Sequence, residues 1–221
     1  MKVLHHYNQD HNTTSATEMV PYIIKLVQPK SVVDVGCGLG QWLEVFADHG
    51  VKTTLGIDGS HVLKEKMRIP RENFLVGDLC NAKDISVNGS YDLVISLEVG
   101  EHLDKNCADQ YVRFLTSLGS VILFSAAIPF QTGENHINEQ YPEYWQEKFG
   151  NYDFVYLDPF RVKFWNNDSI NWWYRQNMFL VVHKKLVSKY PYPYNENFYI
   201  HPKLYELHAP TSRFLESSLK S

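Results

Sequence analysis

Short apolar runs alternate with segments of helical periodicity along most of this 221-residue chain. Runs of this length are typical of buried strands, and they occur at residues 32–35, 52–57, 73–76, 91–97, 121–126, 152–157 and 178–183. Helices are predicted at residues 14–27, 41–50, 104–118 and 142–149, and Pro21 indicates a break or a late first turn in the first of them. The order predicts an α/β fold, a single doubly wound seven-stranded sheet, mostly parallel with one antiparallel edge strand, and helices on both faces.

The alternation ends near residue 187, and the composition then changes. Residues 1–187 are expected to form one domain, in which residues 1–28 are a polar N-terminal arm and the first helix. The arm is either a frayed end or a lid over the site. The run Lys189-Tyr190-Pro191-Tyr192-Pro193-Tyr194 cannot form a central strand or a helix. Residues 188–221 are therefore expected to be a Tyr/Pro-rich tail that packs on the domain or on a partner subunit.

Composition excludes several classes of protein. The formal charge is -4, with 21 Lys and Arg against 25 Asp and Glu and no basic block, so a DNA partner is not expected. Residues 1–10 lack the apolar core of a signal peptide, and the longest apolar run, residues 121–130, falls short of the roughly 20 residues of a membrane span. Cys37, Cys80 and Cys107 are odd in number and widely spaced. They predict a reducing, cytoplasmic location, with neither a disulfide framework nor a metal cluster.

A glycine-rich turn follows the first strand. Asp34 ends that strand, and Gly36, Gly38 and Gly40 follow at alternate positions, with the small side chain of Cys37 among them. Glycines let the backbone approach a ligand closely, and the N-terminus of the next helix offers free N–H groups. The spacing is G-x-G-x-G rather than the G-x-G-x-x-G of dinucleotide sites.

Acidic residues also follow the next three strands. Asp58, at the end of the second strand, is placed to accept two hydrogen bonds from a ribose diol, although it could instead cap a helix starting near Ser60. Asp78 follows the third strand and Glu98 the fourth. Because the carboxyl ends of parallel strands meet at one edge of a sheet, these side chains are expected to share a cleft.

The pattern Asp34-x-Gly36-x-Gly38-x-Gly40 resembles motif I of the class I S-adenosylmethionine-dependent methyltransferases. The resemblance implies a Rossmann-like domain with S-adenosylmethionine as methyl donor. It implies a cofactor site made of Asp34, Gly36, Cys37, Gly38, Gly40, Asp58, Gly59, Asp78, Leu79 and Glu98. In that family the residue at the position of Asp78 meets the adenine amino group, and the next backbone N–H meets a ring nitrogen.

A second group of polar residues lies beyond the fourth and fifth strands. Glu98, Glu101 and His102 are spaced to share one face if the strand passes directly into a helix, and His136 follows the fifth strand. Two carboxylates and two imidazoles suit one divalent cation with positions left open for substrate oxygens. Alternatively, the Glu-His pair shapes the pocket without a metal. Gly100, inside this segment, is expected to enlarge the pocket.

The segment Glu98-Val99-Gly100-Glu101-His102 resembles the E-x-x-E-H segment of two methyltransferase groups. These are the small-RNA 3′-terminal 2′-O-methyltransferases and the ubiquinone-biosynthesis O-methyltransferases, and both methylate one oxygen of a vicinal diol. The resemblance implies Mg²⁺ or Mn²⁺ bound by Glu98, Glu101, His102 and His136. It also implies catalytic roles for His102, His136 and Glu101, of which a histidine or a glutamate serves as base.

Residues 136–145 and 173–177 resemble segments common in methyltransferases of polysaccharide and glycan biosynthesis. The function expected is O-methylation of a sugar hydroxyl in a glycan or glycolipid precursor, by a chain that acts alone or as a homodimer. Trp165, Trp172, Trp173 and Tyr174 are either a wall for the sugar or ordinary packing. The alternatives are a catechol-like acceptor, an RNA 3′ end, which the lack of a basic patch disfavours, and a non-catalytic cofactor-binding subunit.

Overall fold

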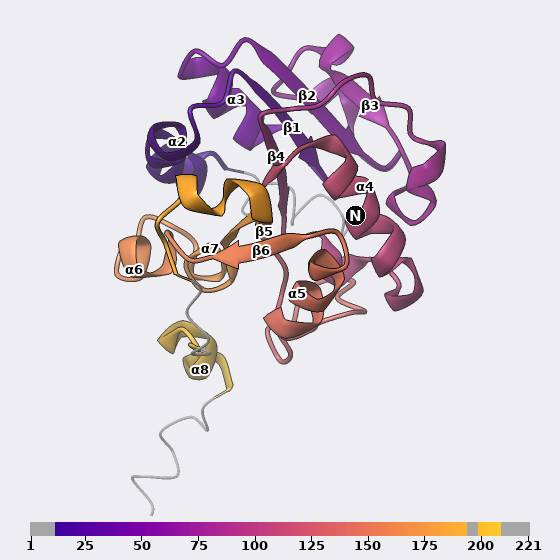
Figure 1. Ribbon diagram of the computed structural model, residues 1–221. Helices are drawn as coiled ribbons and strands as arrows, with labels where there is room; N and C mark the ends of the chain where they lie inside the picture. The colour runs from indigo at the N-terminus through magenta and orange to yellow at the C-terminus, as the bar shows by residue number, and fades with distance from the viewer. Residues whose placement is uncertain (1–11, 194–198, 209–221) are drawn as a thin grey trace, which may run out of the picture.

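The computed structural model describes residues 12–193 and 199–208, and these form an α/β domain around a twisted sheet (Figure 1). Within the described residues the sheet has seven strands in the order β3-β2-β1-β4-β5-β7-β6. The strands are β1 (Ser31–Val35), β2 (Thr53–Asp58), β3 (Phe74–Val76), β4 (Leu93–Leu97), β5 (Val121–Ser125), β6 (Phe154–Leu157) and β7 (Phe179–His183). Only β7 runs antiparallel to its neighbours β5 and β6, and it lies one position in from the edge. The fold class predicted from the sequence is confirmed.

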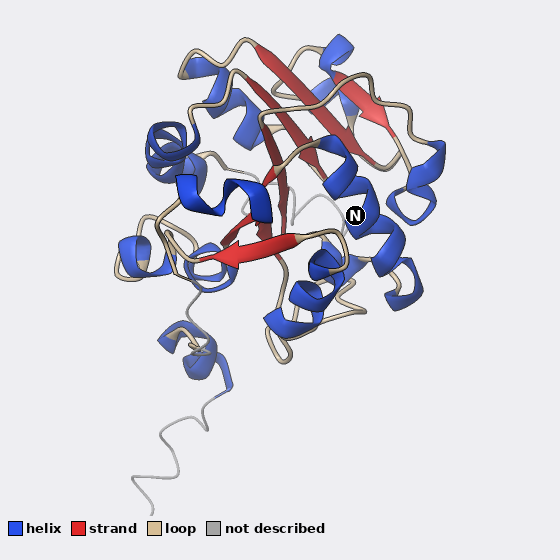
Figure 2. Ribbon diagram, in the orientation of Figure 1, coloured by secondary structure: helices blue, strands red, loops and turns tan. Residues whose placement is uncertain are grey.

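Helices cover both faces of the sheet (Figure 2). The helices of the described residues are α2 (Thr14–Val27), α3 (Gln41–Asp48), α4 (Ala108–Leu118), α5 (Pro142–Gly150), α6 (Arg161–Phe164), α7 (Trp172–Asn177) and α8 (Pro202–His208). Helix α8 lies apart from the sheet (Figure 1). Short 3₁₀ turns connect the elements: η1 (Lys64–Lys66), η2 (Arg71–Asn73), η3 (Leu79–Asp84), η4 (Gly100–His102), η5 (Lys105–Cys107) and η6 (Lys184–Lys189). None of the helices in the described part of the chain is long and apolar enough to cross a membrane.

Two apolar cores follow from the alternation of side chains along the strands. In β1, Val32 faces the core under α2 and α3, whereas Val33 faces the core under α4 and α5. Successive side chains of a strand point to opposite faces, so a continuous apolar run is needed where both faces are covered. The mainly apolar runs in the sequence therefore indicate strands of a sheet that is buried on both faces.

Helix α2 runs through Pro21 without a break, contrary to the expectation from the sequence. Met19, Val20 and Ile23 are fully buried on either side of the proline. Proline removes one backbone hydrogen bond and crowds the preceding turn. We attribute the continuity of the helix to this apolar packing, which outweighs that local cost.

Cys80 and Cys107 form a disulfide, which corrects the prediction that the chain carries none. The two residues are 27 positions apart, but η3 and η5 bring their Cα atoms to 4.9 Å. Such proximity cannot be read from spacing alone. Cys37 is a buried free thiol, and burial, followed by the charges of Asp34 and Asp58, raises its pKa.

The part of the tail that the structure describes packs on the domain. Tyr190 is buried, and Tyr22 of α2 donates a hydrogen bond to the hydroxyl of Tyr192 at 3.3 Å. Further along, Leu204 of α8 is buried. The predicted N-terminal arm lies largely in residues 1–11, outside the described residues.

Candidate functional site

The glycine turn after β1 folds onto the end of β2. The N–H groups of Gly36 and Cys37 donate to the carbonyl of Ile57 at 2.7 and 3.2 Å. Gly36 has a φ of +82°, and a Cβ at this position would lie 2.3 Å from Cγ2 of Val99. A glycine is therefore required both by the backbone conformation and by the close packing of the segment after β4.

Asp58 holds this turn in place. Its carboxylate accepts hydrogen bonds from the N–H of Gly38 at 2.7 Å and of Gly59 at 2.6 Å. The alternative role as a helix cap is not realised, because the next helical turn begins at Lys64 with Leu63 as its cap. Asp58 therefore fixes the glycine turn from the end of the neighbouring strand.

Asp34 and Asp78, two further acidic residues of the predicted cofactor site, differ in their surroundings. Asp34 is buried, and its burial, reinforced by the charge of Asp58, raises its pKa well above the ordinary value. Asp78 is exposed at the end of β3 and accepts hydrogen bonds from Asn81 and from the N–H of Cys80, and these lower its pKa. Leu79, which follows it, is buried.

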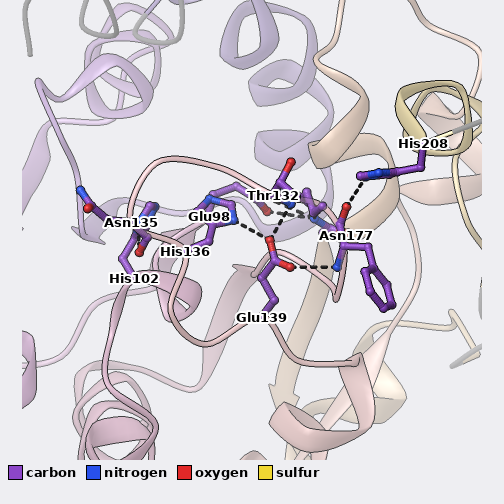
Figure 3. Close-up of polar contacts among 10 residues, drawn as sticks. Glu98, His102, Thr132, Asn135, His136, Glu139, Asn177 and His208 are labelled. Atoms are coloured by element: carbon purple, nitrogen blue, oxygen red, sulfur yellow. Dashed lines mark hydrogen bonds and ion pairs between the residues drawn. The ribbon is translucent and has the colours of Figure 1, made fainter. Parts of the chain in front are cut away.

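Glu98 does not share a helical face with Glu101 and His102, because the chain does not pass from β4 directly into a helix. Glu98 has a φ of +55°, a left-handed turn, and only then does the 3₁₀ turn η4 begin. Its carboxylate accepts hydrogen bonds from Gln131 at 2.8 Å and from Asn177 at 3.3 Å (Figure 3). Burial raises the pKa of Glu98, although these hydrogen bonds oppose the shift.

Glu101, unlike Glu98, has a carboxylate that accepts no hydrogen bond from another side chain among the described residues. The side chain of Glu101 is 0% exposed. Burial, followed by repulsion from Glu98, raises the pKa of Glu101 well above its ordinary value, although the backbone N–H groups of Glu101 and Ala127 oppose the shift. Its backbone carbonyl accepts the N–H groups of Ile137 and Asn138 at 2.9 and 3.0 Å, which fixes the end of the loop that carries His136.

The imidazoles of His102 and His136 meet edge to face, with ring centroids 4.9 Å apart. Nδ1 of His102 lies 3.3 Å from the carbonyl of Asn135, and Nδ1 of His136 lies 2.9 Å from Oε1 of Glu139 (Figure 3). Carbonyl and carboxylate oxygens only accept, so Nδ1 is the donor in both rings and each Nε2 keeps its lone pair when the ring is neutral. Burial, followed by the charge of His136, lowers the pKa of His102.

Glu101, His102 and His136 come together as one cluster. Each offers one ligand atom, and these atoms lie within 4.8 Å of one another. Glu98, the fourth ligand predicted from the sequence, is not part of this group. Two imidazoles and one buried carboxylate could hold a divalent cation and leave open positions.

Three polar residues of the site were not singled out by sequence reasoning. Gln131 and Asn177 are buried and bind each other as well as Glu98. Glu139 accepts hydrogen bonds from the N–H groups of Phe130 and Thr132 and from His136. Asn177 and Glu139 lie in the segments at residues 173–177 and 136–145 that drew attention in the sequence, and this is the one signal that could have found them.

On the acceptor side the structure corrects one expectation and decides one alternative for two tryptophans. Gly100 does not open the pocket, since a Cβ there would lie 2.6 Å from the ring of Trp145, which already fills the space. Trp165 and Trp172 pack against His201 of the C-terminal segment, with ring centroids 4.9 and 6.4 Å apart. These two tryptophans therefore hold the tail.

A family model described as a methyltransferase domain matches residues 5–184. The chain belongs to this family. It is a methyltransferase, and S-adenosylmethionine is the methyl donor of the family. A comparison with curated protein sequences finds no match.

Solved structures share the fold of this methyltransferase at low sequence identity. An S-adenosylmethionine-dependent methyltransferase from Clostridium acetobutylicum matches with a TM-score of 0.60 and 13% identity, over 82% of this chain and 98% of that one. The magnesium protoporphyrin IX methyltransferase of Synechocystis, with bound S-adenosylhomocysteine, matches with a TM-score of 0.57 and 18% identity, over 77% and 83%. A Nostoc punctiforme protein assigned as an O-methyltransferase matches with a TM-score of 0.56 and 18% identity, over 78% of this chain but only 56% of that one.

Proposed function

We propose that this methyltransferase transfers a methyl group to a sugar hydroxyl, one of a vicinal pair, in a glycan or glycolipid precursor. In this proposal a divalent cation is held by Glu101, His102 and His136. Asp34, Asp58 and the glycine turn bind S-adenosylmethionine at the carboxyl ends of β1 and β2. The acceptor lies on the far side of the donor's methyl group, against the loop that carries His136.

The observation that carries the proposal is the state of Glu101. A carboxylate that is 0% exposed and receives no side-chain hydrogen bond in the described structure is costly to ionise, and only the backbone N–H groups of Glu101 and Ala127 offset that cost. The Nε2 lone pairs of the two neighbouring imidazoles are oriented by hydrogen bonds at Nδ1 to Asn135 and Glu139, and a hydrogen bond at the other ring nitrogen is what commonly orients a metal-binding histidine. A cation would satisfy the carboxylate and use both lone pairs.

The donor set favours Mn²⁺ over Mg²⁺. Magnesium prefers oxygen ligands and keeps its waters, whereas imidazole suits the transition metals. Two of the three candidate ligands are imidazoles. A bound cation of this kind would lower the pKa of a chelated hydroxyl.

The residues around the cluster also suit an oxygen acceptor when no cation is present. The carboxylate of Glu139, 2.9 Å from Nδ1 of His136, would stabilise the imidazolium formed if Nε2 accepts a proton from the acceptor hydroxyl. Bound donor supplies an electrophilic methyl carbon, and the chain's task is to align the acceptor oxygen with it. The cation route and the histidine-base route differ in their sensitivity to a chelator.

A sugar acceptor is preferred to RNA because the formal charge is -4 and basic residues are not clustered. The segments at residues 136–145 and 173–177, which resemble those of glycan methyltransferases, contribute Glu139, His136 and Asn177 to the site. The Synechocystis neighbour acts on a magnesium porphyrin. Similarity at this level shows the fold alone, so it does not extend that substrate to this chain.

The test is transfer of a radiolabelled methyl group from S-adenosylmethionine to a panel of nucleotide sugars, free glycans, a catechol and a short RNA with a 3′-terminal diol. Each reaction is run with added Mn²⁺ and with a chelator. Methyl transfer to a sugar that is lost when chelator is added supports the proposal in full. Methyl transfer to a sugar that persists with chelator contradicts the cation and leaves the histidine-base route.

Two variants and one control sharpen this experiment. His102→Ala and His136→Ala should lower turnover while binding of S-adenosylhomocysteine, measured by calorimetry, stays near wild type. His49→Ala, at the end of α3 and outside the site, should change neither quantity. Label found only in the catechol or the RNA, or in no acceptor, contradicts the sugar proposal.

A further inference from the structure

The C-terminal segment returns to the domain and touches the loop that carries His136. His208, the last residue of α8, lies with Nε2 2.6 Å from the carbonyl oxygen of Phe130 (Figure 3). The carbonyl can only accept, so His208 donates this hydrogen bond. Phe130 is the first residue of the loop that ends at Glu139, which we call the histidine loop (residues 130–139).

The histidine loop has a backbone that needs support. Phe130, Thr132 and Asn135 have φ values of +71°, +58° and +59°, in the left-handed region that side chains disfavour. Glu139 holds the loop from inside, because its carboxylate accepts the N–H groups of Phe130 and Thr132 and the Nδ1 proton of His136. The contact from His208 therefore acts on the same residue, Phe130, that Glu139 binds.

The other end of this segment is fixed to the domain. The N–H of His201 donates to Oε1 of Gln176 at 2.7 Å, and the imidazole of His201 packs on Trp165 and Trp172. The side-chain amide of Gln176 donates to Oδ1 of Asn177 at 3.0 Å. Asn177 in turn binds Glu98, so the segment is connected to both polar groups of the site.

We propose that α8 is a positioning element for the acceptor side of the site, in which His208 holds the histidine loop and thereby the orientation of His136. The expected effect of α8 on turnover rests on the proposed function. The expected effect of His208 on the histidine loop does not depend on which acceptor is methylated. His208 contacts the loop backbone and not the reacting atoms. It is a positioning residue.

The matched variants are His208→Ala, His208→Gln and Lys203→Ala. The first removes the donor, and the second keeps an N–H donor on a side chain of similar length. Lys203 lies on the same helix, and its ammonium group pairs only with exposed Glu206 in the described structure, so it serves as the control. All three changes are on the surface and leave the two cores intact.

The primary readout is hydrogen exchange of the amides in the histidine loop, with the imidazole ¹⁵N shifts of His136 as a second signal. We expect the exchange rates of the Phe130 and Thr132 amides to rise about fivefold in His208→Ala, because the loop loses the net contribution of one hydrogen bond. Exchange should return toward wild type in His208→Gln and remain unchanged in Lys203→Ala. Amides of Gly36 and Gly38 should exchange alike in every variant.

Failure of this inference is distinguishable from failure of the proposed function. Unchanged loop exchange and an unchanged His136 signal in His208→Ala overturn the inference, whether or not any acceptor is methylated. If these signals change while wild type labels no sugar, the inference stands and the sugar assignment fails. Where a labelled acceptor is found, turnover should fall in His208→Ala with the KM for S-adenosylmethionine unchanged, and unchanged turnover contradicts the catalytic role given to α8.

Discussion

His136 donates its Nδ1 proton to Glu139 across 2.9 Å, and the same carboxylate holds the backbone on which His136 stands. One side chain thus fixes both the tautomer of the imidazole and the shape of the loop. Partners of this kind commonly contribute about 10- to 100-fold to metal affinity or activity.

Glu139→Gln should therefore lower Mn²⁺ affinity and methyl transfer by about tenfold or more. The amide oxygen can still accept a hydrogen bond, but it carries no charge to complement the imidazole. Calorimetry with Mn²⁺ and the label-transfer assay measure the two effects. Glu147→Gln, on the exposed side of α5, is the control, and equal behaviour of the two variants would refute the role of Glu139.

Asp58→Ala should weaken binding of S-adenosylhomocysteine by an order of magnitude or more, about 1.4 kcal/mol or above. The change removes the acceptor for the N–H groups of Gly38 and Gly59, so the glycine turn loses its anchor as well as the predicted ribose contact. Asp58→Asn keeps one acceptor oxygen and should lose less. Asp48→Ala, exposed at the end of α3, should bind as wild type, and calorimetry distinguishes the three.

Gly100→Ala should destabilise the fold by about 1–3 kcal/mol, the usual cost of overpacking. Its Cβ would lie 2.6 Å from the ring of Trp145, which is itself buried against Phe124 and Tyr111. Gly150→Ala is matched to it, because a Cβ there meets nothing within 4 Å. Urea unfolding of both variants should show a loss of stability only at position 100.

Asp34→Asn should stabilise the cofactor-free protein increasingly as pH rises. The pKa of Asp34 is raised in the folded state, above its ordinary 3.8, by burial and by Asp58. The folded wild type therefore holds a proton that the unfolded chain releases, and the stability this provides is lost as pH rises through the folded pKa. The asparagine variant does not titrate.

The measurement for Asp34 is the free energy of unfolding at several values between about pH 4 and pH 8. The difference between Asp34→Asn and wild type should grow with pH, and a constant difference would show that Asp34 is not a buried titrating group. Asp48→Asn, which is exposed, should run parallel to wild type. The same Asp34→Asn variant is expected to bind S-adenosylhomocysteine less well.

The sheet could be predicted from the sequence because both faces are buried. In β4 and β5 every residue is buried, and all but Ser96 and Ser125 are apolar, so each strand reads as a mainly apolar run. The glycine turn and the acidic residues after β1 and β2 could be predicted for a related reason, since parallel strands align their carboxyl ends. The paths of loops were harder, and there the predictions were wrong or incomplete.

Glu98 and the disulfide show why the paths of loops could not be predicted from residue spacing. The spacing of Glu98, Glu101 and His102 favours one helical face, but a single left-handed residue at Glu98 separates them. The pairing of Cys80 with Cys107 depends on how η3 and η5 meet, a tertiary contact that spacing does not report. Helix α8 was not predicted in the tail, and its contact with the histidine loop depends on a hydrogen bond to a backbone carbonyl, which leaves no mark in the sequence.

The most direct test of the central claim is a calorimetric titration of Mn²⁺ and, separately, of S-adenosylhomocysteine into metal-free wild type, Glu101→Gln and His136→Ala. The account predicts that wild type binds both, and that each variant loses the ion while keeping the nucleoside at wild-type affinity. Absence of Mn²⁺ binding to wild type, or joint loss of both ligands in either variant, would contradict a cation cluster separate from the donor site.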